Sequence, residues 1–281
     1  MPTLQKMPTG ISALDAKING GALEGDLILL LGMTGAGHYE FCLTSAAKLT
    51  LAKENPERIE YFIGTLPKNV KFPNEIHYIT FAKSKNNVLS EVRASFNKDF
   101  SNAIITKVQF RDFSRMYFHN TIIPPQWTEE DNRKSTFLDS GYNNVKLLES
   151  LIEYLEQNAK NNLVIMDSIT DLLVSNNVSS TDLIAFLRGL QRISKKWKGL
   201  IYLLLTTDIV QPNLQNAIID SVDNVFFFEW SKSRRTTKLS RYMTILKSMP
   251  ILLHLREEEI EKFAIDITSN TGLVVSDYIR V

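Results

Sequence analysis

The stretch that decides the fold of this chain reads Asp26-Leu-Ile-Leu-Leu-Leu-Gly32-Met-Thr-Gly35-Ala-Gly37-His38-Tyr39. Its first part, residues 26–31, is a short apolar run that predicts a buried strand. The glycine-rich part predicts a tight turn, and the residues that follow, 38–53, have the apolar spacing of a helix. A strand, a glycine loop and a helix in this order form a phosphate-binding unit.

Strands and helices alternate along most of the remaining chain. Further strands are expected at residues 59–63, 76–81, 163–167 and 199–205, and helices at 89–96, 142–157 and 181–197. This alternation predicts an α/β fold with a mostly parallel central sheet, flanked by helices and joined by right-handed crossovers. The tail differs, because residues 225–229, 241–247, 263–267 and 273–275 read as strands without long helices between them. These strands predict an antiparallel C-terminal edge.

The whole chain, residues 1–281, is expected to form one domain, because no repeat and no flexible linker divides it. Residues from about 82 to 142 are the hardest to interpret. They contain a Pro-Pro pair and a long polar run, which are typical of an exposed loop. We expect a divergent insertion here, with strands near 103–110 and 115–123.

The composition is that of an ordinary globular protein, with 281 residues, 44% hydrophobic and 22% charged. A net charge of +1 gives no global reason to expect nucleic acid or an anionic membrane as partner. The single cysteine, Cys42, excludes an internal disulfide and a cysteine-rich metal site, and it favours a cytoplasmic location. The longest apolar runs, Leu27–Leu31 and Leu200–Leu205, are too short to cross a bilayer, so no membrane partner is expected.

Several short motifs follow one another in a characteristic order. They are Thr9-Gly10, Leu14-Asp15, Gly20-Gly21 and Gly25 before the first strand, Asp167-Ser168 at the end of an apolar strand, Asp223-Asn224-Val225-Phe226, and Phe263–Thr268 followed by Gly272–Val275. In these motifs the chain resembles the RecA/KaiC-like ATPase superfamily, in particular its archaeal-type KaiC/GvpD group. The resemblance implies a RecA-like P-loop fold, an ATP site with Mg²⁺, and head-to-tail assembly of subunits.

The phosphate loop departs from the pattern G-x-x-x-x-G-K-[ST] of that superfamily, because His38 takes the lysine position and Tyr39 the hydroxyl position. A neutral imidazole lacks the charge and the reach of a lysine. A tyrosine cannot place its hydroxyl where serine or threonine would hold Mg²⁺. The residues expected to form this degenerate nucleotide site are Gly32, Thr34, Gly35, Ala36, Gly37, His38, Tyr39, Asp167, Ser168 and Lys247.

The resemblance implies two further catalytic groups that this chain lacks. Family members carry paired glutamates just after the second strand, and with residues 59–63 as that strand, Thr65 and Leu66 take their positions. Neither side chain accepts a proton from water. KaiC-like rings also supply Lys-x-Arg from a neighbouring subunit, and here Lys247 is kept while Met249 replaces the arginine. Asp167 is left, either as a weak ligand of Mg²⁺ or as a cap of its strand.

Three features outside the loop allow more than one interpretation. Cys42 is expected to be an inert core residue rather than a redox sensor. Trp127, in the polar insertion, either anchors a partner or packs back onto the domain. A basic run with Arg234, Arg235 and Lys238 predicts a nucleic-acid or subunit contact, or else a solvated turn.

The function expected from these observations is that of a catalytically impaired pseudo-ATPase. It would act through a protein partner or through oligomerisation, in regulation or signal transduction. ATP or ADP with Mg²⁺ would bind weakly, and no other cofactor is expected. One alternative is an ATP-binding protein with weak ATPase activity. Another is a recombinase-paralogue-like DNA-repair accessory protein that uses the basic run.

Overall fold

The computed structural model describes residues 5–119, 121–128, 147–175, 177–232, 239–252 and 262–276. Within these residues, a nine-stranded sheet has the order β11-β10-β9-β8-β3-β7-β6-β4-β5, and β1 pairs with β2 in a separate sheet. The pairs from β8 to β5 are parallel, whereas β9, β10 and β11 run antiparallel to their neighbours. The predicted mostly parallel sheet with an antiparallel C-terminal edge is therefore confirmed.

Strands and helices alternate along most of the chain, as predicted. The strands are β1 (Lys6–Met7), β2 (Ala22–Leu23), β3 (Leu27–Gly32), β4 (Ile76–Thr80), β5 (Gln109–Asp112), β6 (Leu163–Asp167), β7 (Leu200–Thr206), β8 (Asn224–Lys232), β9 (Leu239–Lys247), β10 (Phe263–Thr268) and β11 (Gly272–Ser276). The helices are α1 (Ser12–Lys17), α2 (His38–Glu54), η1 (Pro56–Arg58), α3 (Ile59–Ile63), α4 (Lys85–Ser95), α5 (Lys98–Lys107), α6 (Ser114–Tyr117), η2 (Pro125–Trp127), α7 (Leu147–Asn158), α8 (Ile169–Val174), α9 (Ser180–Trp197), α10 (Pro212–Asp220) and α11 (Met249–Leu252). None of the described helices combines the length and the apolar character needed to span a bilayer.

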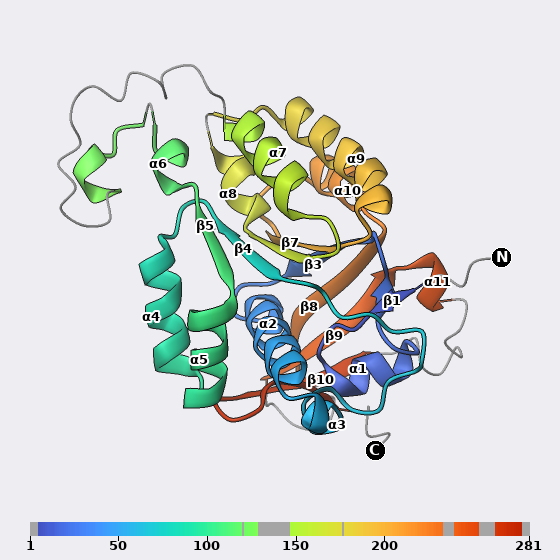
Figure 1. Cartoon of the computed structure of the whole chain (residues 1–281). Coiled ribbons are helices and arrows are strands. Elements are labelled where there is room, and N and C mark those ends of the chain that lie inside the picture. Colours follow the sequence, from blue (N-terminus) through green and yellow to red (C-terminus); the bar gives the residue numbers. More distant parts are fainter. Residues whose placement is uncertain are drawn as a thin grey trace.

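Helices cover both faces of the sheet, with α2, α4 and α5 on one side and α7, α8, α9 and α10 on the other (Figure 1). Alternate side chains of β3 enter the two resulting cores, because successive residues of a strand point to opposite faces. Leu27, Leu29 and Leu31 join the core under α7–α10, and Ile28 and Leu30 join the core under α2. A strand buried on both faces explains why β3 reads as a continuous apolar run.

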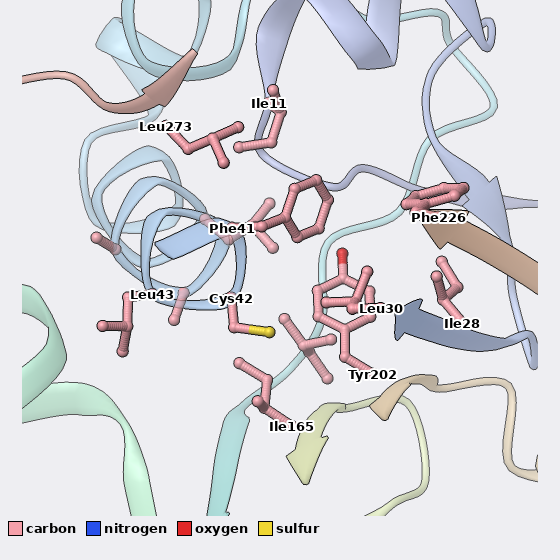
Figure 2. Close-up of a cluster of buried hydrophobic side chains, with 14 of the residues drawn as sticks. Ile11, Ile28, Leu30, Phe41, Cys42, Leu43, Ile165, Tyr202, Phe226 and Leu273 are labelled. Atoms are coloured by element: carbon pink, nitrogen blue, oxygen red, sulfur yellow. The ribbon is translucent and has the colours of Figure 1, made fainter. Parts of the chain in front are cut away.

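The core under α2 is dense with aromatic rings (Figure 2). Phe41 on α2 lies 5.8 Å from the ring of Tyr202 on β7 and 6.1 Å from the ring of Phe226 on β8. Cys42 is fully buried beside them, and burial raises the pKa of its thiol well above the ordinary value. A buried, protonated thiol is unreactive, which supports the interpretation of Cys42 as an inert core residue.

The amino-terminal motifs have a structural role in front of β3. The buried Asp15 carboxylate accepts hydrogen bonds from the Thr9 amide (2.8 Å), the Thr9 hydroxyl (2.8 Å) and the Gly10 amide (2.9 Å). These bonds fix the Thr9-Gly10 turn against α1. Gly21 has a positive φ of 114°, and a Cβ there would lie 2.1 Å from the Met7 carbonyl oxygen. Only glycine allows this close approach of backbone to backbone.

We expect Asp15→Ala at pH 5 to lower the free energy of unfolding by about 1–3 kcal/mol, because alanine leaves three buried donors without an acceptor. Burial raises the pKa of Asp15 to about 7, so at pH 5 the ionisation cost that alanine removes is smaller than this loss. Urea denaturation checks this prediction. Asp266→Ala is the matched control, since Asp266 is exposed on β10 and its loss should cost less than about 0.5 kcal/mol. Equal effects of the two substitutions would contradict the assigned role of Asp15.

Three predictions of secondary structure were wrong. Residues 59–63 form α3 outside the sheet and not a strand, so the next parallel strand after β3 is β4. The strand expected near 103–110 is mostly α5, with only β5 at its end, and the one expected near 115–123 begins as α6. Short apolar runs do not distinguish a strand from a helix turn, which explains these errors.

The expected insertion is only partly described. Residues 85–112 form α4, α5 and β5, and β5 extends the main sheet. Trp127 has 77% of its surface exposed, so its ring does not pack back onto the domain. The polar residues 129–146, which include the first part of the helix expected at 142–157, lie outside the described residues.

Candidate functional site

The glycine loop joins β3 to α2 at the carboxyl end of the parallel strands. β3 ends at Gly32 and α2 begins at His38, with Gly37 at the N-cap in the left-handed region at φ 118°. Among the described residues, the amide nitrogens of Gly35, Gly37, His38 and Tyr39 meet no hydrogen-bond acceptor. Unbonded amides at a helix amino terminus can bind an anion.

The C-terminal hairpin holds the exposed tip of this loop. The indole nitrogen Nε1 of Trp230 on β8 donates to the Thr34 carbonyl oxygen at 3.1 Å, and Nε of Arg241 on β9 donates to the Gly35 carbonyl oxygen at 3.0 Å. The Arg241 guanidinium also lies over the Trp230 ring, 4.4 Å from its centroid. The Thr34 carbonyl and the Gly35 N–H belong to one trans peptide bond, in which they point in opposite directions. Because the carbonyl faces Trp230, the Gly35 N–H points away from the hairpin.

His38 points into the protein and not toward the open side of the loop. The residue is 8% exposed, and a Cβ built on Gly32 would lie only 2.1 Å from its Nδ1 atom. Its ring centroid is 6.3 Å from that of Phe228. Burial lowers the pKa of His38 to about 4, and Nδ1 has no hydrogen-bond partner among the described residues. The imidazole is therefore neutral at pH 7 and brings no positive charge to the loop.

Tyr39 points in the opposite direction, toward α4. Its hydroxyl donates to Oε2 of Glu91 at 2.7 Å, and the ammonium of Lys83 lies 4.4 Å from the centroid of its ring. Burial raises the pKa of the phenol above its ordinary value. The hydroxyl is consequently protonated at neutral pH and donates its hydrogen bond to Glu91. The aromatic ring separates this hydroxyl from the loop backbone.

Asp167 lies at the end of β6, as the motif predicted, and its charge acts on the Tyr39 phenol at the start of α2. Its Oδ2 atom accepts a hydrogen bond of 2.8 Å from the hydroxyl of Tyr78 on β4. Burial raises the pKa of the Asp167 carboxyl to about 6, although the Tyr78 hydroxyl and the Lys83 ammonium oppose this rise. Ser168 caps α8, where its Oγ accepts from the Asp171 amide at 3.3 Å.

The residues after the second core strand must be reassigned. β4 is the parallel neighbour of β6, with Thr80 opposite Asp167, so the chain leaves the sheet beside Asp167 at Phe81, Ala82 and Lys83. The assignment of Thr65 and Leu66 to this place was wrong, because they follow α3. Ala82 and Lys83 lie two and three residues after β4, the same spacing that Thr65 and Leu66 have after residues 59–63.

Lys247 does not lie near the loop of its own chain. Its Nζ donates to the carbonyl oxygens of Ile219 and Asp220, at 3.0 Å each, and so caps the end of α10. β9 places Lys247 opposite Val225, three positions before Phe228, the residue that pairs with Gly32. Within one chain, the structure therefore places Asp167 near the start of α2, where its charge acts on Tyr39, whereas Ser168 caps α8 and Lys247 caps α10. The basic residues Arg234, Arg235 and Lys238 lie outside the described residues.

Sequence reasoning missed five side chains that complete the surroundings of the loop. They are Tyr78, Lys83, Glu91, Trp230 and Arg241. Each reaches the loop or Asp167 through a contact between distant elements, which no local pattern reveals. One local signal was available, since Ser84 accepts from the Asn87 amide as the N-cap of α4 and so marks the end of the β4 segment.

We expect Asp167→Asn to stabilise the protein at pH 8 by about 1–2 kcal/mol, with the gain disappearing below about pH 4. The folded-state pKa of Asp167 is raised to about 6 from its ordinary value of 3.8. Between these values the unfolded chain gives up the proton first, so ionisation lowers stability as the pH rises. Asparagine removes this cost and still accepts from Tyr78. Urea denaturation from pH 4 to pH 8 measures the difference, and a gain independent of pH would contradict the assignment.

The order of parallel strands, with the glycine loop after β3 and Asp167 at the end of β6, defines a RecA/KaiC-like fold. The flagellar accessory protein FlaH from Methanocaldococcus jannaschii shares this fold at a TM-score of 0.61 and 15% identity, with 97% of this chain and 99% of that chain covered. A KaiC-like protein from the archaeon Pyrococcus horikoshii gives a TM-score of 0.59 and 18% identity, again with 97% and 99% covered. No protein-family model and no curated protein sequence matches the chain.

Proposed function

We propose that this chain is a RecA/KaiC-like pseudo-ATPase that does not turn over ATP and acts by binding a protein partner or by oligomerising. The observation that carries the proposal is the neutral, buried imidazole of His38 at the position where the P-loop pattern requires a lysine. Without an ammonium, the loop offers amide dipoles only. A phosphate chain of several negative charges would then be held far less tightly than in a working site.

Support also comes from the place of the catalytic base. Ala82 and Lys83 follow β4 beside Asp167. Alanine has no titratable group, and a lysine ammonium donates hydrogen bonds but accepts none. General-base catalysis contributes about 10²–10⁴-fold to a rate, so its loss alone would make hydrolysis slow.

The segment that would supply a lysine and an arginine to the ATP site of a neighbouring subunit is changed as well. Met249 is 79% exposed where the family pattern has an arginine, and Lys247 is used to cap α10. An arginine finger is worth about 10³–10⁵ in rate. An exposed methionine near the half-exposed Leu246 is instead suited to an apolar protein contact.

An accessory rather than a motor role agrees with one of the structural neighbours, which is described as a flagellar accessory protein. The unbonded loop amides leave room for weak binding of ATP or ADP. We therefore separate two properties, weak nucleotide binding and absent turnover. Regulation through a protein partner or through self-association requires neither nucleotide binding nor ATP turnover.

Calorimetric titration with ATP, with and without Mg²⁺, tests the proposal. We expect a dissociation constant weaker than about 1 mM in both cases, corresponding to less than about 4 kcal/mol of binding free energy. Light scattering on the same sample should report an oligomer if the chain acts by oligomerising. A monomer would exclude that mode of action and leave binding of a protein partner. A site that binds MgATP at micromolar concentration and needs Mg²⁺ to do so would favour the alternative of an active ATP-binding protein.

A further inference from the structure

Lys83 lies at the end of β4, within a cluster of acidic and phenolic groups. Its Nζ is 3.0 Å from Oε2 of Glu91, the same oxygen that accepts the Tyr39 hydroxyl. Its ammonium also lies over the Tyr39 ring, 4.4 Å from the centroid. Cation, carboxylate and ring thus form one compact unit between α2, β4 and α4.

The same ammonium acts on the carboxylates at the end of β6. Burial raises the pKa of both Asp167 and Asp171, and the positive charge of Lys83 counteracts the rise in each case. Backbone geometry places these groups together, since Thr80 pairs with Asp167 and the Ala82 amide donates to Oδ2 of Asp171 at 3.4 Å. Lys83 therefore provides a positive charge to the acidic corner formed by Glu91, Asp167 and Asp171.

The RecA-like fold implies Mg²⁺ at this corner, but the residues present do not fit it. Mg²⁺ requires octahedral oxygen ligands and in P-loop proteins uses a short hydroxyl at the start of the helix. Here that position is Tyr39, whose hydroxyl is bonded to Glu91, and one oxygen of Asp167 accepts from Tyr78.

We propose that the Lys83 ammonium replaces the divalent cation, so that this site takes no Mg²⁺. A tethered positive charge offsets part of the negative charge of the carboxylates and repels a second cation at short range. The Tyr39 ring and Glu91 hold the ammonium in place. This inference rests on the proposed function, because it explains how a modified loop site holds its carboxylates without a metal.

Titration with Mn²⁺ alone, followed by electron paramagnetic resonance of the free ion, tests the proposal. The wild-type protein is expected to bind no Mn²⁺ more tightly than about 1 mM. K83E removes the ammonium and adds a carboxylate beside Asp167, and should bind Mn²⁺ at least about ten-fold more tightly. Adding D167N to K83E should abolish that gain.

K85E is the matched control, because Lys85 is exposed two residues further along and lies 5.8 Å from the Phe110 ring, away from Asp167. Its charge change is the same, and we expect no gain in Mn²⁺ binding. Lys83 is 42% exposed, so its substitution should leave the fold intact, which circular dichroism verifies. If K83E misfolds, a wild-type melting temperature that does not rise with Mg²⁺ is the expected second result.

The proposal is overturned if the wild-type protein binds Mn²⁺ in a manner that D167N abolishes, or if folded K83E gains no binding. A rise in the melting temperature of the wild-type protein on addition of Mg²⁺ would also overturn the proposal. These results are separate from ATP turnover. Mn²⁺ binding without hydrolysis would refute the role of Lys83 and leave the pseudo-ATPase proposal intact.

Discussion

Replacing His38 by lysine and Tyr39 by threonine is expected to raise the affinity for ATP by about 10–100-fold while turnover stays near background. The lysine restores a charge-assisted hydrogen bond to phosphate at the start of α2, where the native imidazole is neutral. Turnover stays low because Ala82, Lys83 and Met249 still stand where a base and a trans-acting cation are needed. Because Lys83 remains, the gain in affinity should depend little on Mg²⁺.

Calorimetry and a phosphate-release assay measure the two halves of this prediction. Glu40→Gln is a suitable control, since it removes a negative charge from the same helix turn without supplying a donor to the loop. It should change ATP affinity by less than about three-fold, in keeping with a screened, partly exposed charge. Brisk turnover in the double variant, on the order of 1 s⁻¹ as in ordinary enzymes, would mean that the water-activating group lies elsewhere in the chain.

Gly32→Ala is expected to lower the free energy of unfolding by about 2–3 kcal/mol through overpacking. Gly32 does not have a positive φ, so the cost arises from the His38 ring and not from backbone strain. An alanine Cβ would lie 2.1 Å from Nδ1 and 2.5 Å from Cγ of that ring. Neither distance is tolerable, so the ring or the loop must move.

A double-mutant cycle isolates this contact. His38→Ala alone should cost about 1–2 kcal/mol, since lost packing is partly offset by removal of an unpartnered buried nitrogen. The double variant should be at least about 1 kcal/mol more stable than the sum of the single effects predicts. Gly189→Ala is the control, because a Cβ on this exposed α9 glycine meets nothing within 4 Å. It should stabilise by about 0.5–1 kcal/mol. Strict additivity in the cycle would show that the ring does not fill the base of the loop.

The fold could largely be predicted because its signals are local. The apolar run Leu27–Leu31, the glycines after it and the periodic helix that follows report structure within a few residues of themselves. Asp15 is another case, since its bonds to Thr9 and Gly10 span only six residues or fewer. Such short-range constraints are visible in the order of residue types.

The strand at residues 76–81 was predicted, but its place as the second core strand, next to β6, was not. Residues 59–63 and the β4 residues are both short and largely apolar, and five residues fit a helix turn as well as a strand. β4 also carries His77 and Tyr78, which look unsuited to a buried strand. Their partners explain the apparent conflict, because His77 contacts the Tyr154 hydroxyl at 2.8 Å and Tyr78 donates to Asp167. Hydrogen bonds across 77 and 89 residues leave no trace in a local pattern.

The candidate site was predicted in its composition but not in its geometry. Sequence alone indicated that His38 and Tyr39 change the chemistry of the loop. It did not indicate that the two side chains diverge, with His38 packed against Gly32 and Tyr39 bonded to Glu91. Their directions depend on the space that β8 and α4 leave, which is a property of the packed tertiary structure.

Steady-state phosphate release by the purified wild-type protein, with saturating ATP and Mg²⁺, tests the central claim most directly. With its lysine position neutral and its base position occupied by Ala82 and Lys83, the protein should release phosphate no faster than a buffer blank. Release at about 1 s⁻¹ per chain, removed by D167N, would contradict this account of the molecule.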